Sequence, residues 1–131
     1  MNKHYLSVPV GTEEVRLRLT MAGQKALCAQ FDTDILSILF DCATAPEKLC
    51  ALLTQGLRWP DSGNSITDGD ALYDRLVDDG RSGGAEFAAL AFRLGAVSGL
   101  LTEQQAEELT HSVTNAYEAA FAALTRNDRA D

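Results

Sequence analysis

Apolar side chains in the last third of the chain recur at the three- and four-residue steps of a helix that buries one face. The first such stripe lies in Gly84–Val97 and consists of Phe87, Leu90, Ala91, Leu94 and Val97. The spacing restarts after a short joint, with Ala106, Leu109, Val113, Ala116, Tyr117, Ala120, Phe121 and Leu124. In that joint Thr102 is followed three residues later by Gln105, the pattern of a capping box. These features predict two amphipathic helices, Gly84–Val97 and Thr102–Arg126.

Residues 4–19 follow a two-residue alternation instead, which is typical of a half-buried β-strand. Charged and apolar residues alternate along its second half, in the order Glu14, Val15, Arg16, Leu17, Arg18 and Leu19. The segment Pro9–Thr12 contains a proline and a glycine and supplies turn chemistry. We expect a hairpin of strands His4–Val10 and Glu14–Leu19. Because a lone hairpin is marginally stable in water, its apolar face is expected to rest on helices.

Two helices are predicted between the hairpin and residue 42. Thr20 is a suitable N-cap for Met21–Phe31, whose inward-facing residues are expected to be Ala22, Ala26, Leu27 and Cys28. Thr33 is expected to cap a second helix, which holds Ile35, Leu36, Ile38, Leu39, Phe40 and Cys42. Because this second segment is apolar on most sides, we expect it in the middle of the core.

A third helix is predicted to begin at Pro46, since proline is tolerated at the first helical position, and to be ended by Pro60. Its expected buried stripe is Leu49, Leu52, Leu53, Gly56 and Leu57. Turn-forming residues dominate Trp59–Ser65 and predict an exposed loop, although we expect Trp59 itself to pack into the core. A capping box at Thr67–Asp70 predicts a fourth helix that extends to Asp79, with inward-facing Leu72, Tyr73, Leu76 and Val77.

Together these patterns predict a mainly α fold, in which five to six helices form a compact bundle with a small N-terminal β-hairpin. The length of 131 residues is that of a single domain. We divide it into the hairpin (4–19), a helical body (20–126) and a polar tail (127–131). Ile35–Leu57 is the most densely apolar segment and is expected at the centre. The C-terminal pair of helices is expected to move about Gly83-Gly84 and Ser98-Gly99.

The formal net charge of −8 gives the chain an acidic surface, which repels phosphate backbones and argues against a nucleic-acid partner. No apolar run approaches the roughly 20 residues that span a bilayer, so no membrane association is expected. The first residues lack the pattern of a signal peptide, and we expect a cytoplasmic location. Cys28, Cys42 and Cys50 have no Cys-x-x-Cys spacing, and we interpret them as reduced, buried thiols.

Motifs for catalysis or for metal binding are weak. The acidic cluster comprises Asp61, Asp68, Asp70, Asp74, Asp78 and Asp79. It does not match the glycine and glutamate positions of an EF-hand loop, so a solvated helix face is favoured. Glu107 and His111 stand four residues apart, but a tight zinc site needs three or four ligands. Gly80–Gly84 lacks the lysine of a P-loop and is interpreted as a flexible connector. We therefore expect no catalytic residue, no cofactor, no metal and no enzymatic activity.

Five residues are candidates for contact with a partner protein, namely Arg16, Arg18, Trp59, Tyr117 and Phe121. Arg16 and Arg18 form either a basic docking patch or gatekeepers that keep an edge strand from aggregating, and the sequence favours neither. Tyr117 and Phe121 belong to the C-terminal stripe, part of which the helix pair can offer to a partner.

Four segments occur in a suggestive order, namely Val15–Thr20, Asp34–Leu39, Leu52–Leu57 and Ser65–Asp74. In this order the chain resembles the tail assembly chaperones of long-tailed bacteriophages, prophages and gene transfer agents, over about residues 5–98. The resemblance implies a small, mainly helical protein of the host cell cytoplasm without enzymatic activity. Such a protein binds tail-tube and tape measure proteins and helps tail-tube subunits polymerise along the tape measure. The helix Thr102–Arg126 is longer than expected of compact members, and the family frequently adds a frameshifted extension.

Two other functions stay open on the residues alone. One is a helical adaptor or small regulatory protein that dimerises through its C-terminal helices and forms a stable homo-oligomer. The other is an enzyme whose site is assembled only in space, which would need His4 or His111 beside a cysteine in a pocket.

Overall fold

A two-stranded antiparallel hairpin opens the chain, with β1 at Leu6–Val10 and β2 at Glu13–Leu17. The structure, a computed structural model, describes residues 4–130. The strands pair from Leu6 opposite Leu17 to Val10 opposite Glu13. Gly11 makes the turn between them with a φ of +62°, which glycine adopts without strain. The ladder is therefore shorter at both outer ends than the strands predicted from the alternation.

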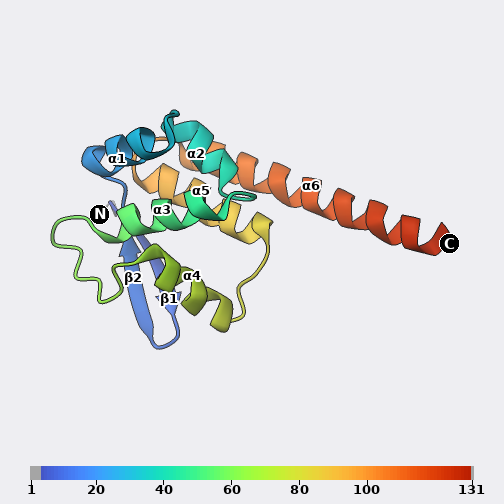
Figure 1. Ribbon diagram of the computed structural model, residues 1–131, viewed down its shortest axis with the longest axis horizontal. Helices are drawn as coiled ribbons and strands as arrows, with labels where there is room; N and C mark the ends of the chain where they lie inside the picture. The colour runs from blue at the N-terminus through green and yellow to red at the C-terminus, as the bar shows by residue number, and fades with distance from the viewer. Residues whose placement is uncertain (1–3, 131) are drawn as a thin grey trace.

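Six helices follow within the described residues, namely α1 (Met21–Phe31), α2 (Ile35–Asp41), α3 (Pro46–Leu57), α4 (Gly69–Asp78), α5 (Gly84–Val97) and α6 (Glu103–Ala130). The predicted mainly helical fold with a small N-terminal hairpin is confirmed. The hairpin and the first five helices gather around one core, whereas the end of α6 projects past them (Figure 1).

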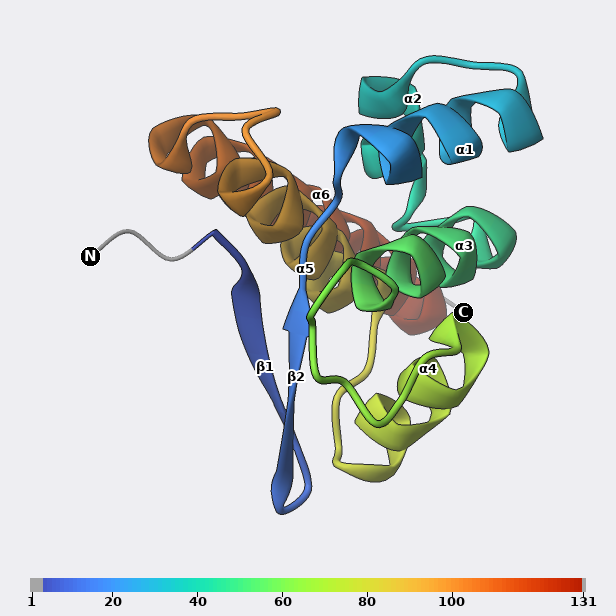
Figure 2. The ribbon, with the colours of Figure 1, turned by 90° about the vertical axis from the view of Figure 1, so that its left-hand side faces the viewer.

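The most completely buried helix is α5. Its buried residues are Phe87, Ala88, Leu90, Ala91, Phe92, Leu94 and Gly95. They lie on more than one side of the helix because α5 packs against α2, α3, α6 and β1, and Figure 2 shows it among these elements. The predicted bounds Gly84–Val97 are confirmed, and within the predicted stripe only Val97 is half-buried. This helix, rather than α2, occupies the centre of the fold.

The prediction that the α2 segment is central is wrong. This helix buries Ile38 and Leu39 but leaves the side chains of Leu36 and Phe40 41% and 48% exposed. A seven-residue helix offers one face to its neighbours, and α2 directs that face toward α1, α3 and α5. Phe40 still touches the core at its rim, because its ring meets that of Phe92 edge-on with centroids 5.6 Å apart.

The predicted buried stripe of α3 is confirmed at all five positions. The helix begins with Pro46 in its first turn and ends at Leu57, three residues before Pro60. It approaches α4 closely at Gly69, whose N–H donates to Thr54 Oγ1 at 2.8 Å. A Cβ atom added to Gly69 would overlap the carbonyl oxygen of Cys50 and lie 2.8 Å from the backbone nitrogen of Thr54. A glycine is therefore needed where α4 begins.

Helix caps agree with the predictions at some ends and differ at others. Thr20 caps α1 as predicted and accepts from the Gly23 N–H at 3.2 Å. Asp34, not Thr33, caps α2, and its carboxylate accepts from the Ser37 N–H at 2.9 Å. Asp68, not Thr67, is the N-cap of α4. At both corrected ends an aspartate follows the threonine, and its charged carboxylate is the stronger acceptor.

Three side chains predicted to face inward are exposed. Ala22 and Ala26 of α1 lie at the surface, and Val77 of α4 is 42% exposed. In α1 the buried positions are Gly23 and Leu27. The Cα of Gly23 lies so close to α3 that an added Cβ would be 3.5 Å from Gln55 Cβ, so the helix contact is made by the glycine and not by the alanines.

The joint between α5 and α6 has the predicted chemistry. Gln105 N–H donates to Thr102 Oγ1 and Thr102 N–H donates to Gln105 Oε1, both at 3.0 Å, which confirms the capping box. Gly99 takes a φ of +86° in the turn before it. The helix then continues past Arg126 to Ala130, so residues 127–130 of the predicted polar tail are helical. Asp131 lies outside the described residues.

Replacing Gly69 by alanine should destabilise the fold, because the new methyl group would force α4 away from the α3 backbone. We expect the free energy of unfolding in urea to fall by about 2–3 kcal/mol. Gly63→Ala is the matched control, since its site has open space and a positive φ costs only about 1 kcal/mol. Equal losses in the two variants would contradict the close contact.

Asp34 should make α2 sensitive to acid. The backbone and hydroxyl hydrogen bonds from Ser37 hold the pKa of Asp34 below its ordinary value of 3.8. A lowered folded-state pKa stabilises the fold above the unfolded pKa, and this contribution is lost as the pH falls through the folded pKa. In thermal unfolding, the melting temperature of the wild type should exceed that of Asp34→Ala at neutral pH. The difference between the two melting temperatures should shrink as the pH is lowered. The difference between Asp34→Asn and Asp34→Ala should not change with pH, because neither variant has a titratable group at this position.

Candidate partner-binding surface

The long helix α6 is covered by the body along its first half only. Ala106 is buried, and Leu109 and Val113 are half-buried against the core. Tyr117 makes the last contact, donating its hydroxyl to the carbonyl oxygen of Ala43 at 3.2 Å. Beyond it the exposed fractions rise to 62% for Phe121 and 57% for Leu124. The apolar spacing of α6 therefore continues to Leu124, in the part of the helix that extends past the other elements in Figure 1.

We name the side chains of Tyr117, Ala120, Phe121 and Leu124 the distal stripe. They recur at the three- and four-residue steps that place side chains on one face of a helix. The rings of Tyr117 and Phe121 lie 6.4 Å apart between centroids. Large apolar side chains that gather on an exposed face mark a contact site for another protein more often than a free surface.

The helix persists past Tyr117 because its sequence favours helix without tertiary support. The segment is rich in alanine, the strongest helix former, with Ala116, Ala119, Ala120, Ala122 and Ala123. At a rise of about 1.5 Å per residue, the part after Tyr117 projects about 20 Å. The fold therefore presents the distal stripe on a helical arm.

A hollow in the body adjoins the base of this arm. It has a volume of about 280 Å³, and its lining includes Cys42, Leu49, Tyr73 and Phe87. Ala43 and Gly84 also line it, and both touch Tyr117. A Cβ atom on Gly84 would overlap the Tyr117 hydroxyl, so glycine is needed for the ring to reach the body. Tyr117, the first residue of the distal stripe, therefore contacts two of the residues that line this hollow.

Trp59, Arg16 and Arg18 form a separate cluster. The ring of Trp59 stacks on Tyr5 with centroids 6.0 Å apart, and the guanidinium of Arg18 lies 5.9 Å from the Trp59 ring. Arg16 lies 5.3 Å from the centre of the Tyr5 ring. Trp59 is half-buried and not in the core, so that prediction is wrong. Its indole N–H donates to the Arg16 carbonyl at 3.0 Å. The polar end of the ring is thus hydrogen-bonded while the rest of the ring stays half-buried.

The five predicted contact residues therefore do not share one surface. The loop after α3, which carries Trp59, and the arm of α6 lie at opposite ends of the molecule (Figure 1). Tyr117 and Phe121 belong to the distal stripe, whereas Arg16 and Arg18 lie on aromatic rings beside the hairpin.

Asn64 was not identified from the sequence, although it closes the outer edge of β2. Its side-chain oxygen accepts from the Arg16 N–H at 2.8 Å, and its amide nitrogen donates to the Arg16 carbonyl at 2.7 Å. The Arg18 N–H is bonded to the Gly56 carbonyl at 2.9 Å. The loop thus pairs this edge as a third strand would. The only sequence signal was an amide side chain in a turn-rich segment.

The groups considered for metal or thiol chemistry do not form a centre. Among the side chains that the structure describes, those of residues 4–125, no three His, Cys, Asp or Glu converge as metal ligands would. All three thiols are free, but only Cys42 is buried, and Cys28 and Cys50 are half-buried. Burial raises the pKa of Cys42 to about 12 and, with a hydrogen bond to Asp70, that of Cys50 to about 11. Both thiols are therefore protonated, unreactive groups at neutral pH.

Comparison with known proteins adds no relative. No protein family, curated protein or solved structure matches this chain. Within the described residues, no helix combines the length and the apolar character needed to cross a membrane.

Proposed function

We propose that this chain is a non-enzymatic tail assembly chaperone of a long-tailed phage or prophage, acting in the host cell cytoplasm. The distal stripe would hold tail-tube and tape measure proteins until the tail-tube subunits polymerise along the tape measure. The observation that carries the proposal is the exposure of Phe121 and Leu124 on an arm with no cover of its own.

Energetics favours a binding role for this arm. Complete burial of a fully exposed phenylalanine or leucine contributes about 1.5–3 kcal/mol. Phe121 and Leu124 are 62% and 57% exposed, so more than half of that free energy is available for each. The exposed parts of Phe121 and Leu124 do not contribute to the stability of the isolated fold, and exposed apolar surface favours aggregation. A partner that covers Phe121 and Leu124 recovers this free energy, and the adjoining hollow beside Tyr117 offers further apolar surface.

The order of the four family-like segments supports the choice of tail proteins as partners. These segments overlap β2, α2, α3 and α4, all of which belong to the body. The arm lies outside the part of the chain that resembles the family. The resemblance therefore supports the class of protein, and the exposure of the arm supports the location of the binding surface.

A helical adaptor that dimerises through its C-terminal helices is the second candidate, and the same distal stripe favours it, because a second copy could cover it. Sedimentation of the isolated chain at low micromolar concentration separates the two. A stable dimer that Phe121→Ser dissociates would favour the adaptor, and a monomer would count against it.

Co-expression with the tail-tube and tape measure proteins of the same prophage tests the chaperone. We expect more soluble tail-tube protein and its co-purification with this chain. Replacing both Phe121 and Leu124 by serine should abolish both effects, because the apolar contact is lost. Replacing Ala119 and Ala122 by serine is the matched control, since these residues lie on the opposite face of the same helix.

The two outcomes that would contradict the proposal are distinct. If the wild-type chain neither improves solubility nor co-purifies, the chaperone function is wrong. If it does both and the double serine variant does so equally, the function stands but the distal stripe is not its site. Circular dichroism of each variant shows whether helix content is retained.

A further inference from the structure

The two outer edges of the hairpin differ in their hydrogen bonding. On β2, the backbone N–H and C=O of Arg16 face outward and are both bonded to Asn64. Ser7 of β1 stands directly opposite Arg16 in the register. In an antiparallel ladder, directly opposite residues alternate between hydrogen-bonded and non-hydrogen-bonded pairs. In a non-hydrogen-bonded pair, the N–H and C=O of both residues point away from the partner strand. The N–H and C=O of Ser7 therefore point to the other edge of the sheet.

Within residues 4–130, nothing pairs with that second edge. The backbone hydrogen bonds outside the helices and strands, and those to side chains, include none from Ser7. Pro9, the next outward-facing residue, has no N–H and offers only its carbonyl. The unpaired backbone at this edge is thus short and centred on Ser7, which suits a brief added strand and disfavours a long one.

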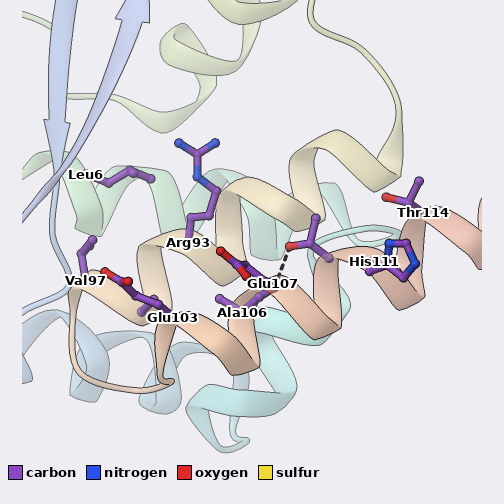
Figure 3. Close-up of a pocket in the computed structure, with 10 residues that line it drawn as sticks. Leu6, Arg93, Val97, Glu103, Ala106, Glu107, His111 and Thr114 are labelled. Carbon is purple, nitrogen blue, oxygen red and sulfur yellow. Dashed lines mark hydrogen bonds between the residues drawn. The ribbon is translucent and has the colours of Figure 1, made fainter.

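A groove of about 480 Å³ lies beside this edge. Leu6 of β1, Ala96 and Val97 of α5, and Ala106 of α6 supply its apolar part. Figure 3 shows Leu6 next to the strands and Val97 and Ala106 on the two helices. Alternate side chains of a strand point to one face of the sheet. Those of a strand added to β1 would follow the direction of Leu6 and Val8 and enter the groove.

Two acidic side chains lie on the α6 wall of the groove, at the end nearest Val97. Glu103 and Glu107 stand one helical turn apart, and both are exposed and line the groove. Two basic side chains also line the groove, Arg93 of α5 across from this wall and His111 farther along α6. None of these four takes part in an ion pair within the described residues. The wall thus favours a positive group on whatever enters.

We propose that β1 binds an extended segment of a partner protein, which adds to the sheet as a third strand. The groove-facing side of the segment carries apolar side chains and a lysine or arginine. Main-chain hydrogen bonds to Ser7 would align the strand, the apolar side chains would cover Leu6 and Val97, and the cation would meet Glu103 and Glu107. This site is distinct from the distal stripe and does not depend on the proposed function.

The probe is the peptide acetyl-Thr-Val-Thr-Lys-Thr-Val-Thr-amide with a fluorescent label, whose Val, Lys and Val share one face. Its partner probe carries Glu in place of Lys. Fluorescence anisotropy should show saturable binding of the Lys peptide to the full chain and weaker binding of the Glu peptide. The variant with Glu103→Gln and Glu107→Gln should bind the two peptides alike.

The backbone contact is tested by Ser7→Pro, which removes the N–H at the edge as Pro9 already does two residues later. Binding of the Lys peptide should weaken about tenfold or more. Ser7→Ala keeps the N–H and should bind as wild type does. Should Ser7→Pro fail to fold, a peptide N-methylated at its threonines should show the same loss on the wild-type chain.

Three results would overturn the proposal. The first is the absence of saturable binding of the Lys peptide to the wild-type chain at millimolar concentration. The second is unchanged binding after both Ser7→Pro and peptide N-methylation, which would remove the strand pairing. The third is a dimer of the wild-type chain that Ser7→Pro dissociates, because the occupant of the edge would then be the β1 strand of a second copy.

Discussion

The burial of α5 is the constraint on which the rest of the structure depends. Its apolar residues face α2, α3, α6 and β1 at once, so each neighbour must offer a complementary face. That requirement explains why α2, α3 and the hairpin each turn one apolar side inward. It also explains the glycine at the close contact of α5, where a Cβ on Gly95 would lie 3.0 Å from Leu39 Cδ1. A Cβ there would require the side chains of Leu39 and Leu101 to shift.

The core formed in this way is shorter than the helix that packs on it. The body reaches along α6 only as far as Tyr117, whose hydroxyl meets Ala43. The apolar spacing of α6 continues to Leu124, and alanines keep the segment helical without tertiary contacts. The distal stripe is exposed because the apolar spacing of α6 continues beyond the part of the helix that the body covers. Within the described residues, the loop with Asn64 pairs with the outer edge of β2, and the outer edge of β1 has no such partner.

Strong local patterns could be predicted from the sequence, and features that depend on distant neighbours could not. The bounds of α5, the buried stripe of α3 and the Thr102–Gln105 capping box are local and were predicted correctly. The burial of α2 was not, because periodicity shows which residues share a face but not how many faces have neighbours. The spacing indicated the stripe that contains Phe121 and a part of it free for a partner, but it did not indicate the residue at which the body stops covering the helix. The pairing of Asn64 with Arg16 spans 48 residues and has no local signal.

Hydrogen–deuterium exchange of the isolated chain tests most directly whether the arm is an uncovered surface. Amides exchange slowly where helices are held by buried contacts and quickly where they are not. In a chain shown to be monomeric, the amides of residues 118–125 should exchange much faster than those of residues 90–95 in α5. Protection of the arm equal to that of α5 in the monomer would contradict the assignment of the distal stripe as a free binding surface.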